Sequence, residues 1–304
     1  MYTIVEKARA KINLHLNVLN KREDGYHNLF SLMAGLDLHD LVILEYYDLA
    51  KDERPPEIRI ENGGGTFSHI LDSIDVNDNL ITFAVKNYLK NAGLSGKLHF
   101  VVEKNIPHGA GLAGGSSDAA AALRAVHSVV KPAIEGIVAK SAIETGSDVP
   151  FCLTSGLAFV EMKGEAVTPV NRELAGFVLL INNGIEINTG HAYGLLNRNL
   201  SHGSSNCCKS KKEEIIAALE KGLPFWNKIF INDFESPVFS EYPQLGLLKN
   251  SLYDAGAEFA LMTGSGSTVF GVFSDEKSCM EAFHYFESKN NRCFFSKFLI
   301  PAVL

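Results

Sequence analysis

The sequence predicts an α+β protein with two domains, and three observations lead to that prediction. The chain has 304 residues, about twice the ~150 residues of a usual domain. Its first half follows the order strands, helix, strand, glycine-rich loop and helix, unlike the regular alternation that builds a parallel α/β sheet. The second half again mixes strands and helices. A break near residues 155–165 gives predicted domains 1–160 and 161–304.

Strands account for most of the N-terminal part of the chain. Residues 3–19 have the alternation and β-branching of a strand and end in a turn-rich segment. Asp24 and Gly25 form a strong turn signal there, because they lie between apolar runs. Residues 30–36 and 41–47 predict two further strands.

The first long helix is predicted after Asp78, which we expect to cap it. Apolar residues recur at i, i+3, i+4 and i+7 from Ile81 to Tyr88, and Gly93 ends the pattern. The next predicted elements are a strand over residues 97–103, a glycine-rich loop over 105–115, an alanine-rich helix over 116–130 and a short helix from Pro132 to about Gly146.

The second half begins with a predicted buried strand over residues 176–181. Residues 201–212 are polar and small, and predict a mobile loop. A helix is predicted over residues 243–255, because proline is near its start and glycine follows its end. The remaining predicted elements are strands over residues 257–262, 268–273 and 294–300, and a helix that starts near Asp275.

Composition limits the possible partners. The chain has 35 acidic and 28 basic residues, for a formal charge of −7, so it has no general attraction for nucleic acid or anionic lipid. No stretch reaches the ~18 apolar residues of a membrane-spanning helix. Glu6 and Lys7 place charges where a signal peptide needs an apolar run. We therefore expect a cytoplasmic protein without nucleic-acid or membrane partners.

The spacing of the cysteines and histidines predicts neither a metal-binding site nor a set of disulfide bonds. The five cysteines include no Cys-x-x-Cys pair, and no histidines have an obvious metal-binding spacing. We therefore expect free thiols and assign no metal-binding residues.

The richest segment is a glycine-rich loop that opens a helix. Glycines let backbone N–H groups converge on an anion, and the helix start adds its own N–H groups and dipole. The sequence therefore predicts a phosphate-binding loop. Its residues are Pro107, His108, Gly109, Ala110, Gly111, Leu112, Ala113, Gly114, Gly115, Ser116 and Ser117.

Other interpretations of this loop remain open from the residues alone. It could be a tight turn followed by a serine helix cap. Gly109-x-Gly111-x-x-Gly114 also fits the dinucleotide fingerprint of an oxidoreductase, with Glu135 near the position of a ribose-binding acid. That fingerprint should follow the first strand of a βαβ unit, whereas several strands and a helix come first here. The Walker loop needs a lysine that this segment lacks.

Lys11, Asn13 and Asp148 are candidates for catalytic or binding roles. Lys11 and Asn13 lie on one face of an apolar strand, where a lysine is usually a solvated edge residue. Asp148 lies in Gly-Ser-Asp-Val-Pro-Phe, where it could simply cap a turn.

Two loops are candidates for ligand contacts. Tyr26 and His27 follow the Asp-Gly turn, which could present two exposed rings and nothing more. Residues 263–267, Thr-Gly-Ser-Gly-Ser, form a second glycine loop that could be a plain hairpin turn.

Taken together, these segments resemble one family of small-molecule kinases. In order, the matching motifs are Ala10-Lys-Ile-Asn-Leu, Arg22-x-Asp-Gly-Tyr-His, Asp78-Asn-Leu-Ile, Ile106-Pro-x-Gly-Ala-Gly-Leu-x-Gly-Gly-Ser-Ser-Asp-Ala-Ala, Gly146-x-Asp-Val-Pro-Phe and Gly264-Ser-Gly. This order is similar to that of the 4-diphosphocytidyl-2-C-methyl-D-erythritol kinases. They belong to the galactokinase, homoserine kinase, mevalonate kinase and phosphomevalonate kinase (GHMP) superfamily. The chain departs from the pattern at Ala113, Ser147 and Ser267, and matches it only loosely over residues 187–193.

The resemblance implies a two-domain GHMP kinase fold with the active site in the inter-domain cleft. It implies ATP-dependent phosphorylation of the 2-hydroxyl of 4-diphosphocytidyl-2-C-methyl-D-erythritol, a step of the non-mevalonate isoprenoid pathway. Asp148 would accept the hydroxyl proton, and Lys11 would stabilise negative charge on the attacking oxygen. Residues 107–117 would hold the ATP phosphates, with Mg²⁺ between phosphate oxygens.

The resemblance also implies a site for the cytidine diphosphate part of the substrate. Tyr26 and Tyr193 would stack on the cytosine ring, and His27 would recognise its polar edge. The full set of implied substrate-binding residues is Asn13, Tyr26, His27, Lys104, Thr189 and Tyr193.

Three alternative functions stay open. A non-catalytic binding protein on this scaffold would be expected to have lost Lys11 or Asp148, and both are present. Another GHMP-type kinase, acting on homoserine or a mevalonate-like alcohol, would keep Lys11, Asp148 and the phosphate loop but would not need Tyr26 and His27. A dinucleotide-dependent oxidoreductase would bind NAD(P) and not ATP. We expect a small-molecule substrate and ATP as partners, and a monomer or homodimer.

Overall fold

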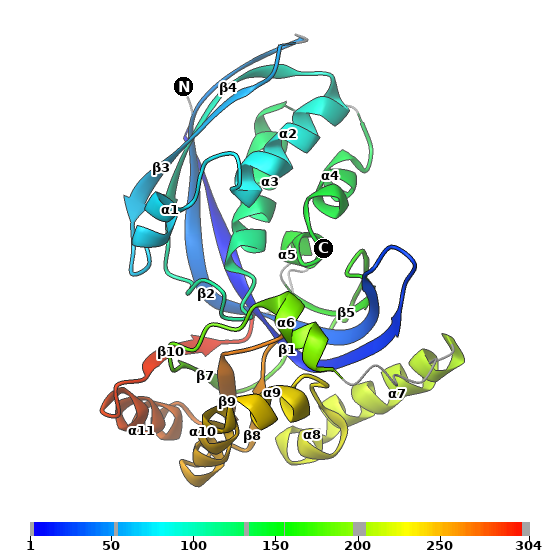
Figure 1. Cartoon of the computed structure of the whole chain (residues 1–304), viewed down its shortest axis with the longest axis vertical. Coiled ribbons are helices and arrows are strands. Elements are labelled where there is room, and N and C mark those ends of the chain that lie inside the picture. The colour runs from blue at the N-terminus through cyan, green and yellow to red at the C-terminus, as the bar shows by residue number, and fades with distance from the viewer. Residues whose placement is uncertain (1–2, 52–53, 131–133, 155, 197–204, 300–304) are drawn as a thin grey trace. The chain divides into compact units, whose positions relative to one another are not determined.

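The computed structural model describes residues 3–51, 54–130, 134–154, 156–196 and 205–299. Helices and strands combine as the predicted α+β class requires (Figure 1). The chain forms two compact units that interleave in sequence. Unit 1 consists of Met1–Ala10, Leu38–His108 and Ala113–Ser155, and unit 2 of Lys11–Asp37, Gly109–Leu112 and Gly156–Leu304.

Two long strands, β1 (Ile4–Lys21) and β2 (His27–Ala50), supply residues to both units. The sequence predicted two strands, over residues 30–36 and 41–47, where the structure has the single strand β2. Polar residues between the two apolar runs led to that error. Asp37 and Asp40 continue the strand, because each carboxylate accepts a backbone N–H from another segment.

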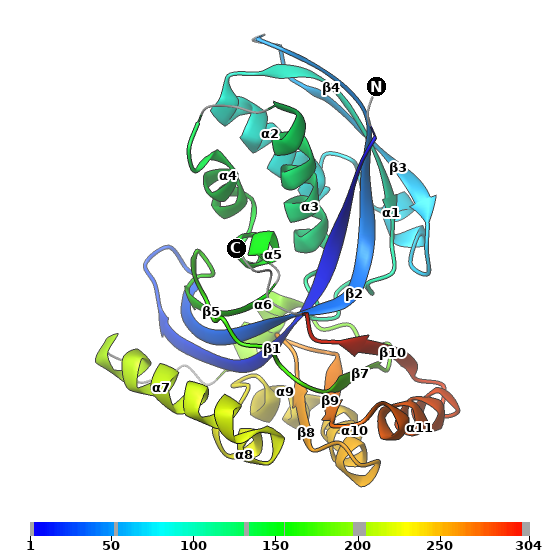
Figure 2. The ribbon, with the colours of Figure 1, turned by 180° about the vertical axis from the view of Figure 1, so that it is seen from behind.

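Unit 1 builds its sheet from β3 (Glu57–Gly64), β4 (Ser95–Glu103) and the second half of β2. β3 pairs with β4 in parallel, and β4 pairs with β2 antiparallel. Helices cover one face of this sheet, as Figures 1 and 2 show. The helices of unit 1 are α1 (His69–Ser73), α2 (Leu80–Ala92), α3 (Gly114–Val130), α4 (Ile137–Thr145) and α5 (Val149–Thr154).

Helix α2 follows the predicted apolar pattern but has a different cap. Ile81 and Tyr88 are fully buried, and Gly93 ends the helix at φ 65° in the left-handed conformation that glycine favours. The capping residue is Asn79 and not Asp78, because the extended Asn79 backbone aims its side-chain oxygen at the N–H of Ile81 (2.9 Å).

Unit 2 contains a four-stranded antiparallel sheet in the order β10-β7-β9-β8. Its strands are β7 (Phe177–Asn182), β8 (Phe259–Met262), β9 (Val269–Phe273) and β10 (Arg292–Lys297). β5 (Leu157–Met162) pairs with the first half of β2, and β6 (Ala166–Pro169) pairs with β5.

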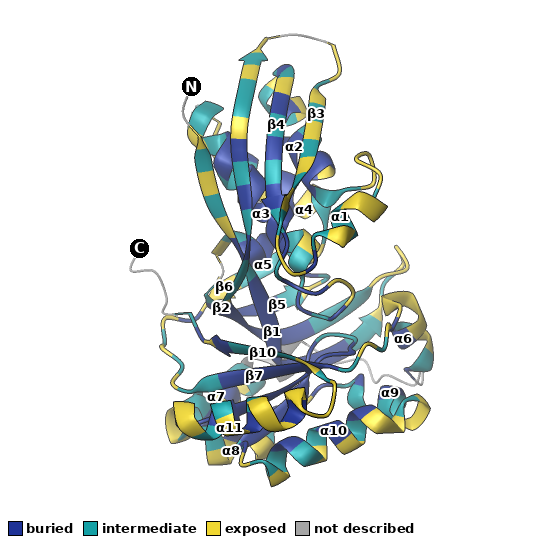
Figure 3. Ribbon diagram, turned by 90° about the vertical axis from the view of Figure 1, so that its left-hand side faces the viewer, coloured by how far each residue is buried: buried dark blue, intermediate teal, exposed yellow. Residues whose placement is uncertain are grey.

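The helices of unit 2 are α6 (Thr189–Leu195), α7 (Ser205–Lys221), α8 (Leu223–Ile229), α9 (Glu235–Glu241), α10 (Pro243–Asp254) and α11 (Glu276–Glu287). Helices α10 and α11 pack on the sheet. Their inner faces are buried and their outer faces are exposed (Figure 3). As predicted, α10 has proline at its first turn and α11 begins after Asp275.

The predicted mobile loop over residues 201–212 is wrong where the structure describes it. Residues 205–212 form the start of α7, while residues 201–204 lie outside the described residues. Ile215 and Ala218 are buried and lie on one side of this helix. The first turns of α7 are polar because only a narrow side of the helix is apolar. Over a short stretch of sequence, such a helix has the same polar composition as a loop.

The predicted start of the short helix at Pro132 lies outside the described residues, and α4 begins at Ile137. Cys152, Cys279 and Cys293 are free thiols. In the part of the chain that the structure describes, no helix has the length and apolarity needed to cross a bilayer.

Candidate active site

The glycine-rich loop connects β4 to α3 and has the conformation that its glycines predict. Gly109 and Gly111 have φ values of 62° and 74°. A Cβ atom on Gly111 would lie 2.4 Å from the carbonyl oxygen of Thr263, so this position admits no side chain. Ala113 also has a positive φ, 58°, at the position where glycine is common in the family.

Helix α3 begins where this loop ends. The Ser117 N–H donates to the Ala113 carbonyl (2.8 Å), so the N–H groups of the first turn, before Ser117, have no partner within the helix. Together with the dipole of this 17-residue helix, these N–H groups favour an anion. The Ser117 hydroxyl is buried and donates to the Arg9 carbonyl (2.5 Å).

The loop residues differ in exposure, which bears on which of them a ligand can reach. Pro107, Ala110, Leu112 and Ser117 are buried, Gly111, Ala113, Gly114 and Ser116 are half-buried, and His108, Gly109 and Gly115 are exposed. Backbone N–H groups near the exposed positions are therefore available to a ligand.

Lys11 lies beside this loop in unit 2. Its ammonium donates to the Gly111 carbonyl (3.0 Å) and to Oδ1 of Asn13 (2.8 Å). The side chain is 3% exposed, so the interpretation as a solvated edge lysine is wrong. Buried polar groups need hydrogen-bond partners, and the Lys11 amine has two oxygen partners next to the glycine-rich loop.

Asn13 links Lys11 to the second glycine loop. Its Oδ1 accepts the Gly264 N–H (3.1 Å), and its own N–H donates to the Thr263 hydroxyl (3.1 Å). The Thr263 hydroxyl also lies 3.2 Å from the Gly111 carbonyl. Segments far apart in sequence thus meet around Lys11. Sequence analysis did not assign Thr263 to the site, although its glycine loop was singled out.

Asp148 lies in unit 1, immediately before α5. Its carbonyl oxygen accepts the Cys152 N–H (3.1 Å), so the residue starts that helix. Lys11 belongs to unit 2.

Tyr26 and His27 lie at the predicted Asp-Gly turn. The Asp24 carboxylate accepts the Tyr26 N–H (3.2 Å), and the Tyr26 ring is 57% exposed. The Lys163 ammonium lies 5.3 Å from the centre of that ring, within cation–π range. Sequence analysis did not find Lys163, which has no motif of its own.

The structure brings His27 and Tyr193 together. Their rings stack with centres 4.9 Å apart and planes 20° apart. Tyr193 comes from α6. Its ring also makes a T-shaped contact with the ring of Phe234, with ring centres 4.9 Å apart. Thr189 starts the same helix and lies 3.3 Å from Ser265 of the second glycine loop, measured between hydroxyl oxygens.

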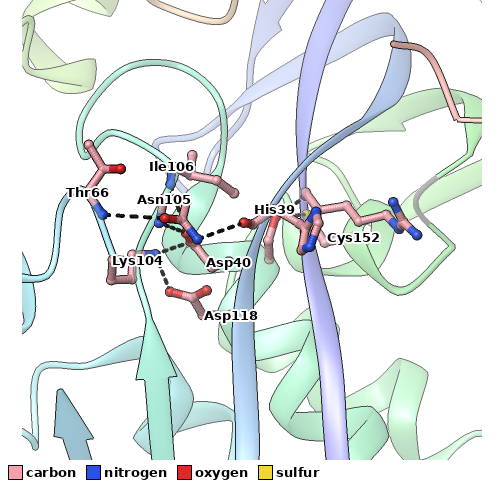
Figure 4. Close-up of polar contacts among 10 residues, drawn as sticks. His39, Asp40, Thr66, Lys104, Asn105, Ile106, Asp118 and Cys152 are labelled. Atoms are coloured by element: carbon pink, nitrogen blue, oxygen red, sulfur yellow. Dashed lines mark hydrogen bonds and ion pairs between the residues drawn. The ribbon is translucent and has the colours of Figure 1, made fainter. Parts of the chain in front are cut away.

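Lys104 directly follows β4 and points into a buried acidic pair in unit 1 (Figure 4). Its ammonium contacts Oδ2 of Asp118 at 2.5 Å and also pairs with Oδ2 of Asp40. Burial alone would lower the pKa of Lys104, but the two carboxylates raise it above its ordinary value. Sequence analysis missed Asp40, whose only signal is a carboxylate inside an apolar strand.

No group of three or more His, Cys, Asp and Glu side chains in the described residues could hold a metal ion.

Comparison with known proteins defines the class of this protein. Residues 79–156 match the model for the GHMP kinases N terminal domain, and residues 205–289 match that for the GHMP kinases C terminal domain. The chain is thus a GHMP kinase.

Relatives define the family within that class. The chain is 32% identical over 295 residues to the 4-diphosphocytidyl-2-C-methyl-D-erythritol kinase of Thermodesulfovibrio yellowstonii, covering 92% of this chain and 93% of the relative. It is 35% identical to the enzyme of the same name from Clostridium tetani, covering 96% and 98%. The chain belongs to the 4-diphosphocytidyl-2-C-methyl-D-erythritol kinase family.

Solved structures agree with this assignment. A crystal structure of 4-(cytidine 5'-diphospho)-2C-methyl-D-erythritol kinase superimposes with a TM-score of 0.75 at 26% identity, covering 97% of this chain and 99% of that chain. Homoserine kinase from Cytophaga hutchinsonii has a TM-score of 0.71 at 17% identity, covering 98% and 97%. The second similarity shows the shared fold.

Proposed function

We propose that this enzyme transfers the γ-phosphate of ATP to the 2-hydroxyl of 4-diphosphocytidyl-2-C-methyl-D-erythritol in the non-mevalonate isoprenoid pathway. Family membership over nearly the whole chain supports the reaction. The geometric observation that carries it is the buried Lys11 ammonium, 3.0 Å from the Gly111 carbonyl of the glycine-rich loop.

The chemical step assigns one role each to Asp148 and Lys11. The 2-hydroxyl oxygen forms a bond to the γ-phosphorus, the bond from that phosphorus to the bridging oxygen breaks, and ADP leaves. The hydroxyl proton goes to the Asp148 carboxylate. Lys11 stabilises the negative charge that develops on the attacking oxygen. Phosphoryl transfer depends mainly on such positioning and charge stabilisation.

The nucleotide phosphates are assigned to residues 107–117. The free N–H groups at the start of α3 and the left-handed glycines of the loop support this assignment. Mg²⁺ would bind together with the nucleotide and neutralise phosphate charge during the transfer, and we assign no residue of the chain to it.

The cytidine part of the substrate is assigned to the aromatic residues of unit 2. The exposed ring of Tyr26 offers a face for stacking, and Tyr193 and His27 already stack on one another. Asn13 and Thr189 supply polar side chains for binding the substrate. Lys104 stays a predicted nucleotide or substrate contact on the family resemblance alone. Its ammonium pairs with Asp40 and Asp118, and its backbone N–H and carbonyl are hydrogen-bonded to Gly64 and Phe67. A cytoplasmic location and a monomeric or homodimeric state remain predictions.

A substrate comparison tests the proposal. The purified enzyme, ATP and Mg²⁺ are incubated with the cytidylated substrate, homoserine or mevalonate, and ADP release is measured. We expect turnover with the cytidylated substrate alone. Turnover of homoserine or mevalonate at an equal or higher kcat/KM would contradict the assignment and favour another GHMP-type kinase. The family match already favours a kinase over the dinucleotide-dependent oxidoreductase.

A further inference from the structure

Asp40, Lys104 and Asp118 form a buried charged cluster beside the glycine-rich loop. They are 0%, 5% and 5% exposed, respectively. Lys104 lies between the two carboxylates, as Figure 4 shows. Three different elements supply these residues: strand β2, the segment directly after β4, and helix α3.

Asp40 holds the chain where it enters the loop. While one oxygen pairs with Lys104, its Oδ1 accepts the N–H of Asn105 and the N–H of Ile106 (2.8 Å). Asn105 also donates from its side chain to the His39 carbonyl (3.4 Å). Both oxygens of Asp40 therefore accept hydrogen bonds. The amide of an asparagine in its place has only one acceptor oxygen and could not accept all of these hydrogen bonds.

Asp118 and Lys104 hold the chain where it leaves the loop. Asp118 lies in the first turns of α3, and Lys104 connects it to Asp40. A Cβ atom on Gly114 would lie 3.6 Å from the Lys104 ammonium and 3.1 Å from Ile106. The cluster therefore lies next to Gly114, the first residue of α3, where the proposed function places the ATP phosphates.

The composition of the cluster does not fit a purely stabilising role. Two carboxyl groups share one ammonium, and Oδ1 of Asp118 has no hydrogen-bond partner in the described structure. Buried ions are expensive to remove from water, and well-packed apolar residues often stabilise a core equally well. What the cluster provides instead is a rigid geometric link between the two ends of the loop.

We propose that Asp40, Lys104 and Asp118 are positioning residues that fix both ends of the glycine-rich loop for binding the ATP phosphates. This inference rests on the proposed function, because that function assigns the phosphates to the loop.

The test compares Asp40→Asn and Asp118→Ala with the native enzyme. ATP affinity is measured by titration, and KM is measured for ATP and for the cytidylated substrate. We expect ATP affinity to weaken by about 10- to 100-fold, the range for losing an outer partner of a binding group. The KM of the cytidylated substrate should change less than twofold. Asp118→Asn should keep most of the ATP affinity that Asp118→Ala loses, because the asparagine amide oxygen can still accept a hydrogen bond from Lys104.

Asp37→Asn is the matched control. Asp37 lies on the same strand and also accepts a backbone N–H, that of Lys297 (2.8 Å). Its carboxylate accepts the Ser296 hydroxyl and the Lys297 N–H, both from β10, so its loss should leave ATP affinity unchanged. Unchanged ATP affinity in folded Asp40→Asn and Asp118→Ala would overturn the proposal, as would a parallel rise in both KM values. Thermal denaturation shows whether each variant is folded, and Asp118→Ala decides the matter if Asp40→Asn does not fold.

A loop variant separates this inference from the proposed function. Gly109→Val alters the loop itself. If it weakens ATP binding and the cluster variants do not, the positioning role is wrong and the phosphate loop stands. If none of the three variants weakens ATP binding, the loop assignment in the proposed function is wrong as well.

Discussion

Asp148 is the residue on which the proposed chemistry depends most directly. Asp148→Asn removes the proton acceptor but keeps the size of the side chain. We expect kcat to fall by roughly 10²–10⁴, the range for loss of a general base, with ATP affinity retained. Steady-state kinetics and ATP titration measure the two quantities.

The control for Asp148 is Asp275→Asn. Asp275 also precedes a helix, where it caps α11 by accepting the Ser278 N–H (2.8 Å). An asparagine can serve as a cap too, so kcat should stay native. Near-native kcat in a folded Asp148→Asn enzyme would remove Asp148 from the chemical step.

Tyr26 should contribute to substrate affinity through its exposed ring. Stacking of a base on one aromatic ring contributes about 1–3 kcal/mol by alanine substitution, which is roughly a 5- to 150-fold change in Kd. Tyr26→Ala should therefore weaken binding of the cytidylated substrate by that factor and leave ATP binding unchanged. Isothermal titration with each ligand gives both values.

Tyr285→Ala is the control for Tyr26. Its ring is 52% exposed and has the Lys289 ammonium 5.7 Å from its centre, much as Lys163 lies over Tyr26. It should leave both affinities native. Equal substrate affinity in the two alanine variants would rule out stacking on Tyr26.

Asp118 should make stability depend on pH. Burial raises its pKa from 3.8 to about 8, Lys104 opposes the shift, and Asp40 adds to it. Between these pH values the folded protein holds a proton that the unfolded chain has released. The stabilisation from this proton is therefore complete below pH ~4 and is lost as the pH rises toward ~8.

Asp118→Asn removes this titration. The free energy of unfolding of the variant, relative to that of the native protein, should rise as the pH rises from 5 to 7, by up to about 1 kcal/mol per pH unit. Urea unfolding at pH 5, 6 and 7 measures it. Parallel pH profiles for the two proteins would show that Asp118 is already ionised in the fold.

The role of Lys11 shows what a strand pattern cannot predict. Its motif indicated a special residue, but local sequence equally allowed a solvated edge lysine. The oxygens that surround it belong to Asn13, two positions away, and to Gly111, which only the folded chain brings near. Asp40 was missed for the same reason, because the N–H groups it accepts lie on a distant segment.

At the scale of the element, the glycine-rich loop offers a matched pair of substitutions. Gly109 and Gly93 have φ values of 62° and 65°, and a Cβ atom on either would meet nothing within 4 Å. Valine at each position therefore carries similar backbone strain. Gly109→Val should weaken ATP binding strongly, whereas Gly93→Val, at the end of α2, should leave it native.

ATP titration of both variants measures this difference, and thermal denaturation confirms that their stabilities match. Gly111→Val would be less informative, because its Cβ would strike the Thr263 carbonyl whether or not nucleotide binds there. Equal ATP affinity in Gly109→Val and Gly93→Val would argue against phosphate binding by this loop.

Elements with strong local signals were predicted well. Helix α2, helix α10 and strand β7 match their predicted ranges to within a few residues, because an apolar period, a proline start or a β-branched run defines each. The start of helix α7 was missed, since residues 205–212 are polar apart from two cysteines. The continuous strand β2 was divided in two, since Asp37 and Asp40 find their partners only in the tertiary structure.

At the scale of the whole molecule, the interleaving of the units predicts how fragments behave. Leu16 and Val18 belong to the apolar core of unit 2. The Leu16 N–H donates to the Ile231 carbonyl (2.8 Å), and the Asp233 N–H donates to the Leu16 carbonyl (3.0 Å). A fragment of residues 156–304 lacks these partners. The division at residue 160 expected from the sequence remains a prediction that this fragment would test.

We expect fragment 156–304 alone to give the poorly dispersed NMR spectrum of an unfolded chain. Restoring residues 11–37, by co-expression with fragment 1–155, should restore dispersion. A well-dispersed spectrum of the isolated fragment would show that the segment 11–37 is dispensable for folding of unit 2.

Because the two units interleave in sequence, they acquire their last residues at different times during synthesis on the ribosome. Every residue of unit 1 has been added once Ser155 is reached, so that unit has all its parts early. Gly35, made near the start, accepts the Leu299 N–H (3.0 Å), which is made near the end. The apolar segment 11–37 thus waits on the order of ten seconds for its last partners at ordinary elongation rates. During that interval the nascent chain exposes a strand without its final neighbours, and exposed unfolded segments of this kind are what holdase chaperones bind in general.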